Sequence, residues 1–157
     1  MEQFASGLAK AGHKVVYGGA CVGLMGHLAD VALSHGGVVR GVIPQYLNKK
    51  GIVHESLTEL LVVDNLLDRK RAMLKESDCA VAFPGGIGTI DEITEALALK
   101  QLGEFSGQIL FHNFLDSWRP LLDFFEELQL RKMISQPLGQ LYNSFDNSED
   151  LLEYLVV

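Results

Sequence analysis

The chain has 157 residues, a formal net charge of −7 and a hydrophobic share of 48%, which suits one domain over residues 1–157 with a buried core. The acidic balance argues against a nucleic-acid-binding surface, which would need clustered Lys and Arg. The two cysteines do not make a disulfide framework, nothing resembles a secretory signal, and no apolar run approaches a membrane span. We therefore expect a cytoplasmic protein without a membrane partner.

Helical and strand patterns alternate along the whole chain. In the first half, the predicted elements are a helix over 1–12, a strand over 14–17, a helix over 24–36, a strand over 38–43, an irregular loop over 45–56, a strand over 60–63 and a helix over 65–77. In the second half they are a strand over 79–83, a helix from about 89, a strand over 108–111, a helix over 116–133, a short strand over 141–145 and a terminal helix from about 147.

The stretch from Phe83 to Glu92 joins a buried strand to a helix through the glycine-rich turn Pro84-Gly85-Gly86-Ile87-Gly88-Thr89. Glycines at such a junction allow the backbone to approach a ligand closely. The free N–H groups and the positive end of the following helix suit an anion, most often a phosphate. A similar turn, Gly18 to Gly26, follows the strand over 14–17. Two such turns favour a pocket for a nucleotide or sugar phosphate.

The alternation of strands and helices predicts an α/β fold, with a Rossmann-like doubly wound parallel sheet and helices on both faces. In such a sheet every strand-to-helix turn emerges at the same carboxyl edge, where ligands bind. Residues far apart in sequence, such as Arg69 and Glu92, can therefore share a pocket. The chain opens on a helix, so we expect the first strand that usually begins such a domain to be missing from this sequence.

Glu92 and Arg69 each have two possible roles. The spacing of Thr89 and Glu92 fits a capping box, a purely structural role, as well as it fits pocket chemistry, and Asp91 and Glu95 are nearby alternatives. Arg69 fits a solvated helix residue, but a cation near a helix start opposes the helix dipole unless an anion is close. Spacing along the sequence does not decide between the two roles of Glu92 or between those of Arg69.

The remaining candidate groups favour structural roles. The five histidines lack metal-ligand spacing, so we expect no metal site. Cys79 opens a predicted strand and Cys21 lies in a glycine turn, and for both a small apolar role is favoured over a reactive one. Trp118, surrounded by leucines, is typical of a packing residue.

The paired motifs resemble those of the LOG proteins, the cytokinin riboside 5′-monophosphate phosphoribohydrolases. The run from Pro84 to Glu92 matches their P-G-G-x-G-T-x-x-E signature, and Tyr17 to Gly26 resembles their second glycine segment. Gly41-Val42-Ile43-Pro44, Leu57-Thr58-Glu59-Leu60 and the pair Arg69-Lys70 fall in the same order. Members of this family are often labelled lysine decarboxylases, but nothing in this sequence resembles a pyridoxal-phosphate site, and no cofactor is expected.

The resemblance implies a hydrolase that cleaves the N-glycosidic bond of AMP or of a cytokinin riboside monophosphate, giving a free base and ribose 5-phosphate. It implies that Arg69 and Glu92 form the catalytic pair. It also implies a set of substrate-binding residues, namely Gly18, Gly19, Met25, Lys70, Gly85, Gly86, Gly88 and Thr89. Family members form dimers, so a homodimer that takes part in cytokinin biosynthesis is the corresponding expectation.

The sequence departs from the family pattern at one motif. The family usually has Met-His-x-Arg-Lys where this chain has Leu66-Leu67-Asp68-Arg69-Lys70, so the Arg-Lys pair is kept without the histidine. The alternative to an enzyme is a non-catalytic nucleotide-binding or regulatory protein of the same fold. DNA binding through such a domain is a third possibility, which the acidic charge disfavours.

Overall fold

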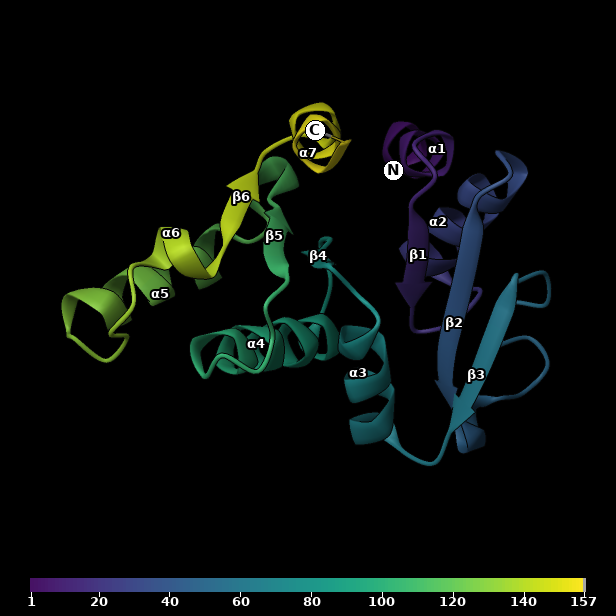
Figure 1. Cartoon of the computed structure of the whole chain (residues 1–157), viewed down its shortest axis with the longest axis horizontal. Coiled ribbons are helices and arrows are strands. Elements are labelled where there is room, and N and C mark those ends of the chain that lie inside the picture. The colour runs from purple at the N-terminus through teal and green to yellow at the C-terminus, as the bar shows by residue number, and fades with distance from the viewer. Residues whose placement is uncertain (157) are drawn as a thin grey trace. The chain divides into compact units, whose positions relative to one another are not determined.

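A computed structural model describes residues 1–156 and divides into two compact units. Unit 1 comprises Met1–Glu76 with the C-terminal segment from Leu152, and unit 2 comprises Ser77–Leu151. Each unit has its own parallel sheet, and Figure 1 follows the chain through both by colour. The expected α/β fold with parallel sheets flanked by helices is confirmed. The single domain over residues 1–157 stays a prediction.

Unit 1 contains a three-stranded sheet in the order β1-β2-β3. Its elements are α1 (Glu2–Lys10), β1 (Lys14–Tyr17), α2 (Gly23–Ser34), β2 (Val38–Pro44), the 3-10 helix η1 (Gln45–Leu47), β3 (Glu59–Val63) and α3 (Leu66–Lys75). Helices α1 and α2 pack against each other, while α3 contacts β2 and β3. Apart from one tyrosine, the core gathers small and β-branched side chains, which let helices lie close to a sheet: Ala5, Val15, Tyr17, Ala29, Ala32 and Val39.

Unit 2 repeats the architecture with a sheet in the order β4-β5-β6. Its elements are β4 (Cys79–Ala82), α4 (Ile87–Gln101), β5 (Gln108–His112), the 3-10 helix η2 (Phe114–Asp116), α5 (Arg119–Leu130), α6 (Leu138–Leu141), β6 (Asn143–Phe145) and the start of α7 (Ser148–Val156). Phe111 at the centre of this core meets Trp118 and Tyr142 edge to face, at centroid distances of 5.7 and 5.2 Å. Trp118 also donates its indole N–H to the Ala82 carbonyl oxygen, so its predicted packing role is confirmed.

The helix predicted over 116–133 was too long at both ends. Leu115 and Asp116 adopt positive φ angles of 53° and 56°, which an α-helix excludes, and α5 begins only at Arg119. Pro120 in the first turn favours that start, because its missing N–H would have no partner there in any case. The strand predicted over 141–145 is likewise shorter, because Leu141 ends α6 and only residues from Asn143 join the sheet.

Candidate functional site

The first glycine turn, residues 18–22, leaves the carboxyl end of β1 in unit 1 and is buried at its start. Gly19 has a φ angle of 77°, in the left-handed region that favours glycine. A Cβ on Gly41 of the neighbouring strand would lie only 2.8 Å from the Gly19 Cα, so the two backbones approach closely. The Tyr17 hydroxyl donates a hydrogen bond to the Ala20 carbonyl oxygen at 3.2 Å. The turn is therefore held in one shape against the sheet.

A second segment, the loop over residues 48–58, holds the same turn from outside the sheet. The Cys21 backbone N–H donates to the Ile52 carbonyl oxygen at 2.8 Å, and the His54 N–H donates to the Gly19 carbonyl oxygen at 3.0 Å. The Cys21 thiol lies 3.4 Å from the Gly51 carbonyl oxygen, within reach to donate. These contacts satisfy backbone groups of the turn that the sheet leaves open.

Arg69 lies against this turn, although 51 positions separate it from Gly18. A Cβ placed on Gly18 would lie 3.5 Å from the Arg69 Nη1 and 3.6 Å from its Cζ, so the guanidinium covers the bare face of the glycine. Asn65 caps α3 by accepting a hydrogen bond from the Asp68 N–H at 3.0 Å. The acidic Asp68 in the first turn of α3 therefore lies at the positive end of the helix dipole, and Arg69 is the next residue. The structure thus brings the predicted site residues Gly18 and Arg69 together.

Two further predicted residues of unit 1 lie on the helices beside the turn. Lys70 follows Arg69 on α3 and is buried, with 9% of its surface exposed. Met25 lies in the first turn of α2 and is 42% exposed. An apolar, exposed side chain beside the first turn can contact a ligand without losing core packing. The substrate-binding roles of Met25, Lys70, Gly18 and Gly19 stay predictions.

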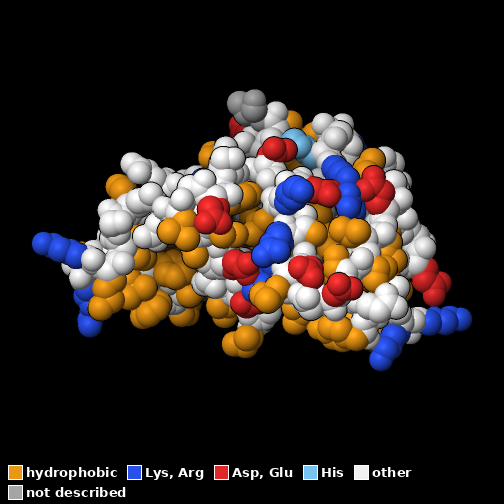
Figure 2. All heavy atoms as spheres, turned by 60° about the horizontal axis from the view of Figure 1, so that its bottom comes forward, with side chains coloured by type: hydrophobic (Ala, Val, Ile, Leu, Met, Phe, Trp, Pro, Cys, Tyr) orange, Lys and Arg blue, Asp and Glu red, His pale blue; other side chains and the backbone are white. Residues whose placement is uncertain are grey.

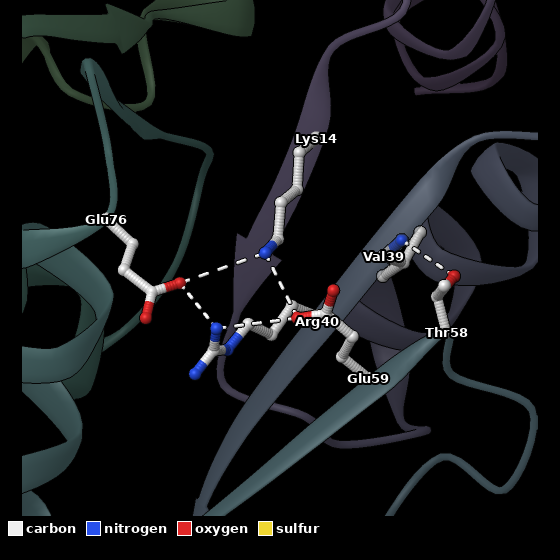
Figure 3. A network of polar contacts seen from close by, with 6 residues as sticks. All are labelled: Lys14, Val39, Arg40, Thr58, Glu59 and Glu76. Carbon is white, nitrogen blue, oxygen red and sulfur yellow. Dashed lines mark hydrogen bonds and ion pairs between the residues drawn. The ribbon is translucent and has the colours of Figure 1, made fainter.

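Four charged side chains tie the far end of α3 to the sheet of unit 1, as Figure 3 shows. Glu76, which caps α3, accepts from the Arg40 guanidinium at 2.6 Å and lies 3.8 Å from the Lys14 ammonium. Glu59 of β3 bonds the same two cations at 3.4 and 3.1 Å. The two cations and two carboxylates balance one another, so the network fixes the position of α3 without leaving a net charge.

The second glycine turn, residues 83–86, leaves β4 in unit 2 and is open. Gly85, Gly86, Ile87 and Gly88 are all exposed, and Gly86 is the N-cap residue of the 15-residue helix α4. No side chain caps this helix, so its first N–H groups are available to an anion. Gly85 lies so close to the Thr89 side chain that a Cβ there would collide with the threonine hydroxyl. Gly85 and Thr89, both predicted to bind phosphate, are therefore neighbours.

The predicted capping box is wrong. Helix α4 begins at Ile87, two residues before the expected start, so Thr89 is the third helical residue and not the cap. Glu92 consequently lies at the start of the second turn, not in the first, and is half-buried. Structural capping thus no longer competes with pocket chemistry as an explanation of Glu92, and its catalytic role stays a prediction.

His112 lies beside the second turn at the carboxyl end of β5. Its ring stacks on that of Phe83, the last residue before Pro84, with centroids 4.9 Å apart and planes 30° apart. The Nε2 atom lies 3.0 Å from the Ser148 hydroxyl oxygen. Burial lowers the pKa of His112 below its usual value, so the neutral ring is favoured at neutral pH. No sequence pattern points to this position, because a single histidine at the end of a strand has no second ligand or catalytic partner at a telling spacing.

The two cysteines differ in exposure. Burial raises the pKa of the Cys79 thiol to about 11, which keeps it protonated and unreactive at neutral pH. Cys21 is exposed. Within residues 1–156, no group of three or more His, Cys, Asp or Glu side chains is arranged to hold a metal ion. Over the same residues, no helix is both long enough and apolar enough to cross a membrane.

The predicted site residues thus form two local groups. Gly18, Gly19, Met25, Arg69 and Lys70 belong to unit 1, where Arg69 meets Gly18. Gly85, Gly86, Gly88, Thr89 and Glu92 belong to unit 2, where Gly85 meets Thr89. Figure 2 shows acidic and basic side chains interspersed with hydrophobic ones on one face of the molecule. The meeting of Arg69 with Glu92 stays a prediction.

These features define a parallel α/β protein in which glycine-rich turns lead from strands into helices. A family model described as "Possible lysine decarboxylase" matches residues 25–155. A cytokinin riboside 5′-monophosphate phosphoribohydrolase from Rhodococcoides fascians is 38% identical over 135 residues, which cover 85% of this chain and 68% of the relative. A protein of the same description from Arabidopsis thaliana is 33% identical over 141 residues, covering 90% of this chain and 62% of the relative.

The chain therefore belongs to the LOG family, the family of the cytokinin riboside 5′-monophosphate phosphoribohydrolases. It spans about two thirds of the length of these two relatives. Solved structures with a similar fold include the molybdenum cofactor carrier protein of Chlamydomonas reinhardtii, with a TM-score of 0.74 at 18% identity, covering 98% of this chain and 82% of that one. A molybdenum cofactor binding protein from Rippkaea orientalis gives a TM-score of 0.69 at 19% identity, with the same coverage. At such identities the likeness concerns the fold alone.

Proposed function

We propose that this protein hydrolyses the N-glycosidic bond of a purine nucleoside 5′-monophosphate, either AMP or an adenine nucleotide substituted at its exocyclic amine, such as a cytokinin riboside monophosphate. The observation that carries the proposal is the guanidinium of Arg69 lying against the bare backbone of Gly18. A cation at the carboxyl edge of a parallel sheet, beside a glycine turn, suits a phosphorylated ligand. Family membership supplies the reaction class.

The reaction breaks the bond between C1′ of the ribose and a ring nitrogen of the base. Water adds its oxygen to C1′ and loses a proton, the base leaves with the bonding electron pair, and its nitrogen takes up a proton. Positive charge builds on the ribose as the bond breaks, and the Glu92 carboxylate stabilises that charge while it orients or deprotonates the water. Arg69 contacts the substrate directly, or holds this carboxylate in place.

The 5′-phosphate binds at the N-terminus of α4. The first N–H groups of that helix have no side-chain cap, and Gly86 and Gly88 leave the approach free of side chains. Thr89, in the first turn, adds a hydroxyl next to Gly85. A phosphate held there positions the C1′–N bond for attack, which lowers the entropic part of the barrier.

We further propose a cytoplasmic homodimer. Nucleoside monophosphates are intracellular metabolites, which supports the location. Large apolar side chains are exposed around the first glycine turn and the start of α3 in unit 1, namely Val22, Leu24, Met25, Leu66 and Leu67, and such surfaces suit contact with another subunit. Light scattering behind a sizing column tests the assembly, and a monomer at micromolar concentration would refute it.

The function is tested by incubating the protein with AMP and with an N6-substituted AMP and by measuring the free base and ribose 5-phosphate released. We expect both products in equal amounts. Replacing Glu92 by Gln removes the charge and keeps the shape, so kcat should fall by about 10²–10⁴-fold. The matched control is Glu104→Gln, an exposed carboxylate in the turn after α4, which should retain full turnover.

The alternative hypothesis, a non-catalytic nucleotide-binding protein, predicts binding of AMP without hydrolysis. It requires tight AMP binding by calorimetry, no release of base, and no change in affinity for Glu92→Gln. Loss of folding in Glu92→Gln, with unchanged activity per folded molecule, would instead assign Glu92 a structural role. Circular dichroism of each variant separates these outcomes.

A further inference from the structure

His54 is a buried histidine of unit 1 whose two ring nitrogens both have partners. Only 8% of its surface is exposed. Its Nε2 lies 3.0 Å from a carboxylate oxygen of Asp30, and its Nδ1 accepts a hydrogen bond from the Ser56 N–H at 3.2 Å. Because Nδ1 is the acceptor, the neutral ring carries its proton on Nε2 and donates it to Asp30.

These contacts involve two segments that flank the first glycine turn. Asp30 comes from α2, the helix that this turn opens, and its side chain is 71% exposed. His54 and Ser56 come from the loop over 48–58, which has no helix or strand of its own. The side chain of His54 therefore connects that loop to α2 across the turn.

The backbone of the same loop contacts the turn directly. The His54 N–H donates to the Gly19 carbonyl oxygen at 3.0 Å, and Ile52 accepts from the Cys21 N–H at 2.8 Å. Ala20 and Val53 form an antiparallel bridge between these two bonds. A loop of eleven residues without regular structure has a large entropy to lose, so side-chain anchors such as His54 decide whether it stays in place.

We propose that His54, oriented by Asp30, is a positioning residue that holds the first glycine turn in its binding conformation. It acts through the loop backbone: the ring fixes the loop, and the loop carbonyl and N–H groups fix Gly19 and Cys21. The turn in turn supports the guanidinium of Arg69 at Gly18. The effect of His54 on nucleotide binding rests on the proposed function. Its effect on the conformation of the first glycine turn does not.

The two bonds of the ring can be removed one at a time. His54→Gln can place its Nε2 near that of histidine and keep the bond to Asp30, while it loses the acceptor for Ser56. His54→Asn places its Oδ1 near the histidine Nδ1 and keeps the bond to Ser56, but is too short for Asp30. His54→Leu removes both bonds and keeps the side chain apolar. His13→Asn, at an exposed position before β1, is the matched control.

The first measurement needs no ligand. Hydrogen exchange of the whole chain, followed by mass spectrometry of peptides covering 18–26 and 49–56, reports the hold on the turn directly. We expect exchange of the Cys21 and His54 amides to be faster by about tenfold or more in His54→Leu, since tenfold corresponds to about 1.4 kcal/mol. The single-bond variants should fall between it and the wild type, and His13→Asn should match the wild type. Unchanged exchange in folded His54 variants would overturn the proposal.

The second measurement uses AMP as the probe. We expect His54→Leu to raise KM by about tenfold with kcat changed far less, with partial recovery in His54→Gln or His54→Asn. Faster exchange with an unchanged KM would show that His54 only stabilises the loop, which also overturns the positioning role. Should the wild type release no base, the proposed function fails, and the AMP dissociation constant of each variant from calorimetry then decides the positioning role. If His54→Leu does not fold, the two single-bond variants carry both tests.

Discussion

The two glycine turns of this protein reach a ligand-accessible shape by different means. The first, after β1, is buried at Gly18 and Gly19 and is held by a loop from elsewhere in the chain and by the guanidinium of Arg69. The second, after β4, begins at Phe83, whose ring stacks on that of His112, and is exposed at Gly85 and Gly86, where it leads directly into α4. The glycines of the first turn are thus held by distant segments, whereas those of the second are exposed at a helix start. Substitutions in the two turns should therefore have different consequences.

The largest effect is expected where the first turn meets Arg69. A Cβ on Gly18 would lie 3.5 Å from the guanidinium, an ordinary contact, so Gly18→Ala should fold and keep most activity. Gly18→Val adds two methyl groups that displace the guanidinium, and a shift of about 1 Å can cost about 100-fold in kcat/KM. Base release from AMP measures both variants. Equal activity of the two would contradict the placement of Arg69.

The next effect concerns stability and contrasts two glycines, one in the first turn of the helix that follows each glycine turn. A Cβ on Gly26 would collide with the Cys21 carbonyl oxygen, whereas nothing lies within 4 Å of a Cβ on Gly88. Gly26→Ala should lower the free energy of unfolding by about 1–3 kcal/mol. Gly88→Ala, in the first turn of α4, should raise it by up to about 1 kcal/mol. Urea titration of both variants checks the contrast, and two equal losses would refute it.

A pH effect is expected in unit 2 from His112. Burial lowers the pKa of His112 in the folded protein, so the unfolded chain binds this proton more readily. Its contribution to stability is therefore intact above pH ~6.5, the usual pKa of histidine, and is lost as the pH falls below that value. His112→Phe should flatten this part of the stability profile, measured by urea titration from pH 7.5 to 5. An unchanged slope would show that His112 does not carry the effect.

The smallest effect is expected at the far end of α3. Glu76→Gln weakens the bonds to Arg40 and Lys14, which are partly exposed, so about 0.2–1 kcal/mol of stability should be lost. The loss should shrink in 1 M salt, because screening weakens exposed pairs. Base release from AMP should change less than for Gly18→Val. If activity falls by a larger factor than the loss of folded protein explains, this network controls the position of Arg69 as well as the stability of α3.

Much of the fold was predictable because strand and helix patterns are local. The strand over 14–17 was placed to the residue, and the strands over 38–43 and 108–111 to within one residue at their ends. The break at Leu115 and Asp116 was missed, because leucine rarely adopts a positive φ angle and one aspartate alone does not signal a break. The start of α4 was misplaced, because a Thr-x-x-Glu spacing looks like a cap even when a glycine three residues upstream of the threonine already serves as one.

The site was predictable only in part. Motif resemblance pointed to Gly18 and Arg69, and the structure places them beside each other, while their roles in binding and catalysis stay predictions. No sequence pattern links Asp30 to His54, which are 24 positions apart on a helix and an irregular loop. Such a contact depends on the path of the loop past the glycine turn. The spacing of residues along the chain does not predict that path.

We propose that Arg69 beside the first turn and Glu92 after the second act on one nucleotide. A double-mutant cycle of kcat/KM for AMP hydrolysis, with Arg69→Ala, Glu92→Gln and the double variant, measures whether they do. We expect the double variant to be barely slower than the worse single variant, because the two groups work as a unit. If the two losses simply multiply, the residues act independently and do not form one catalytic pair.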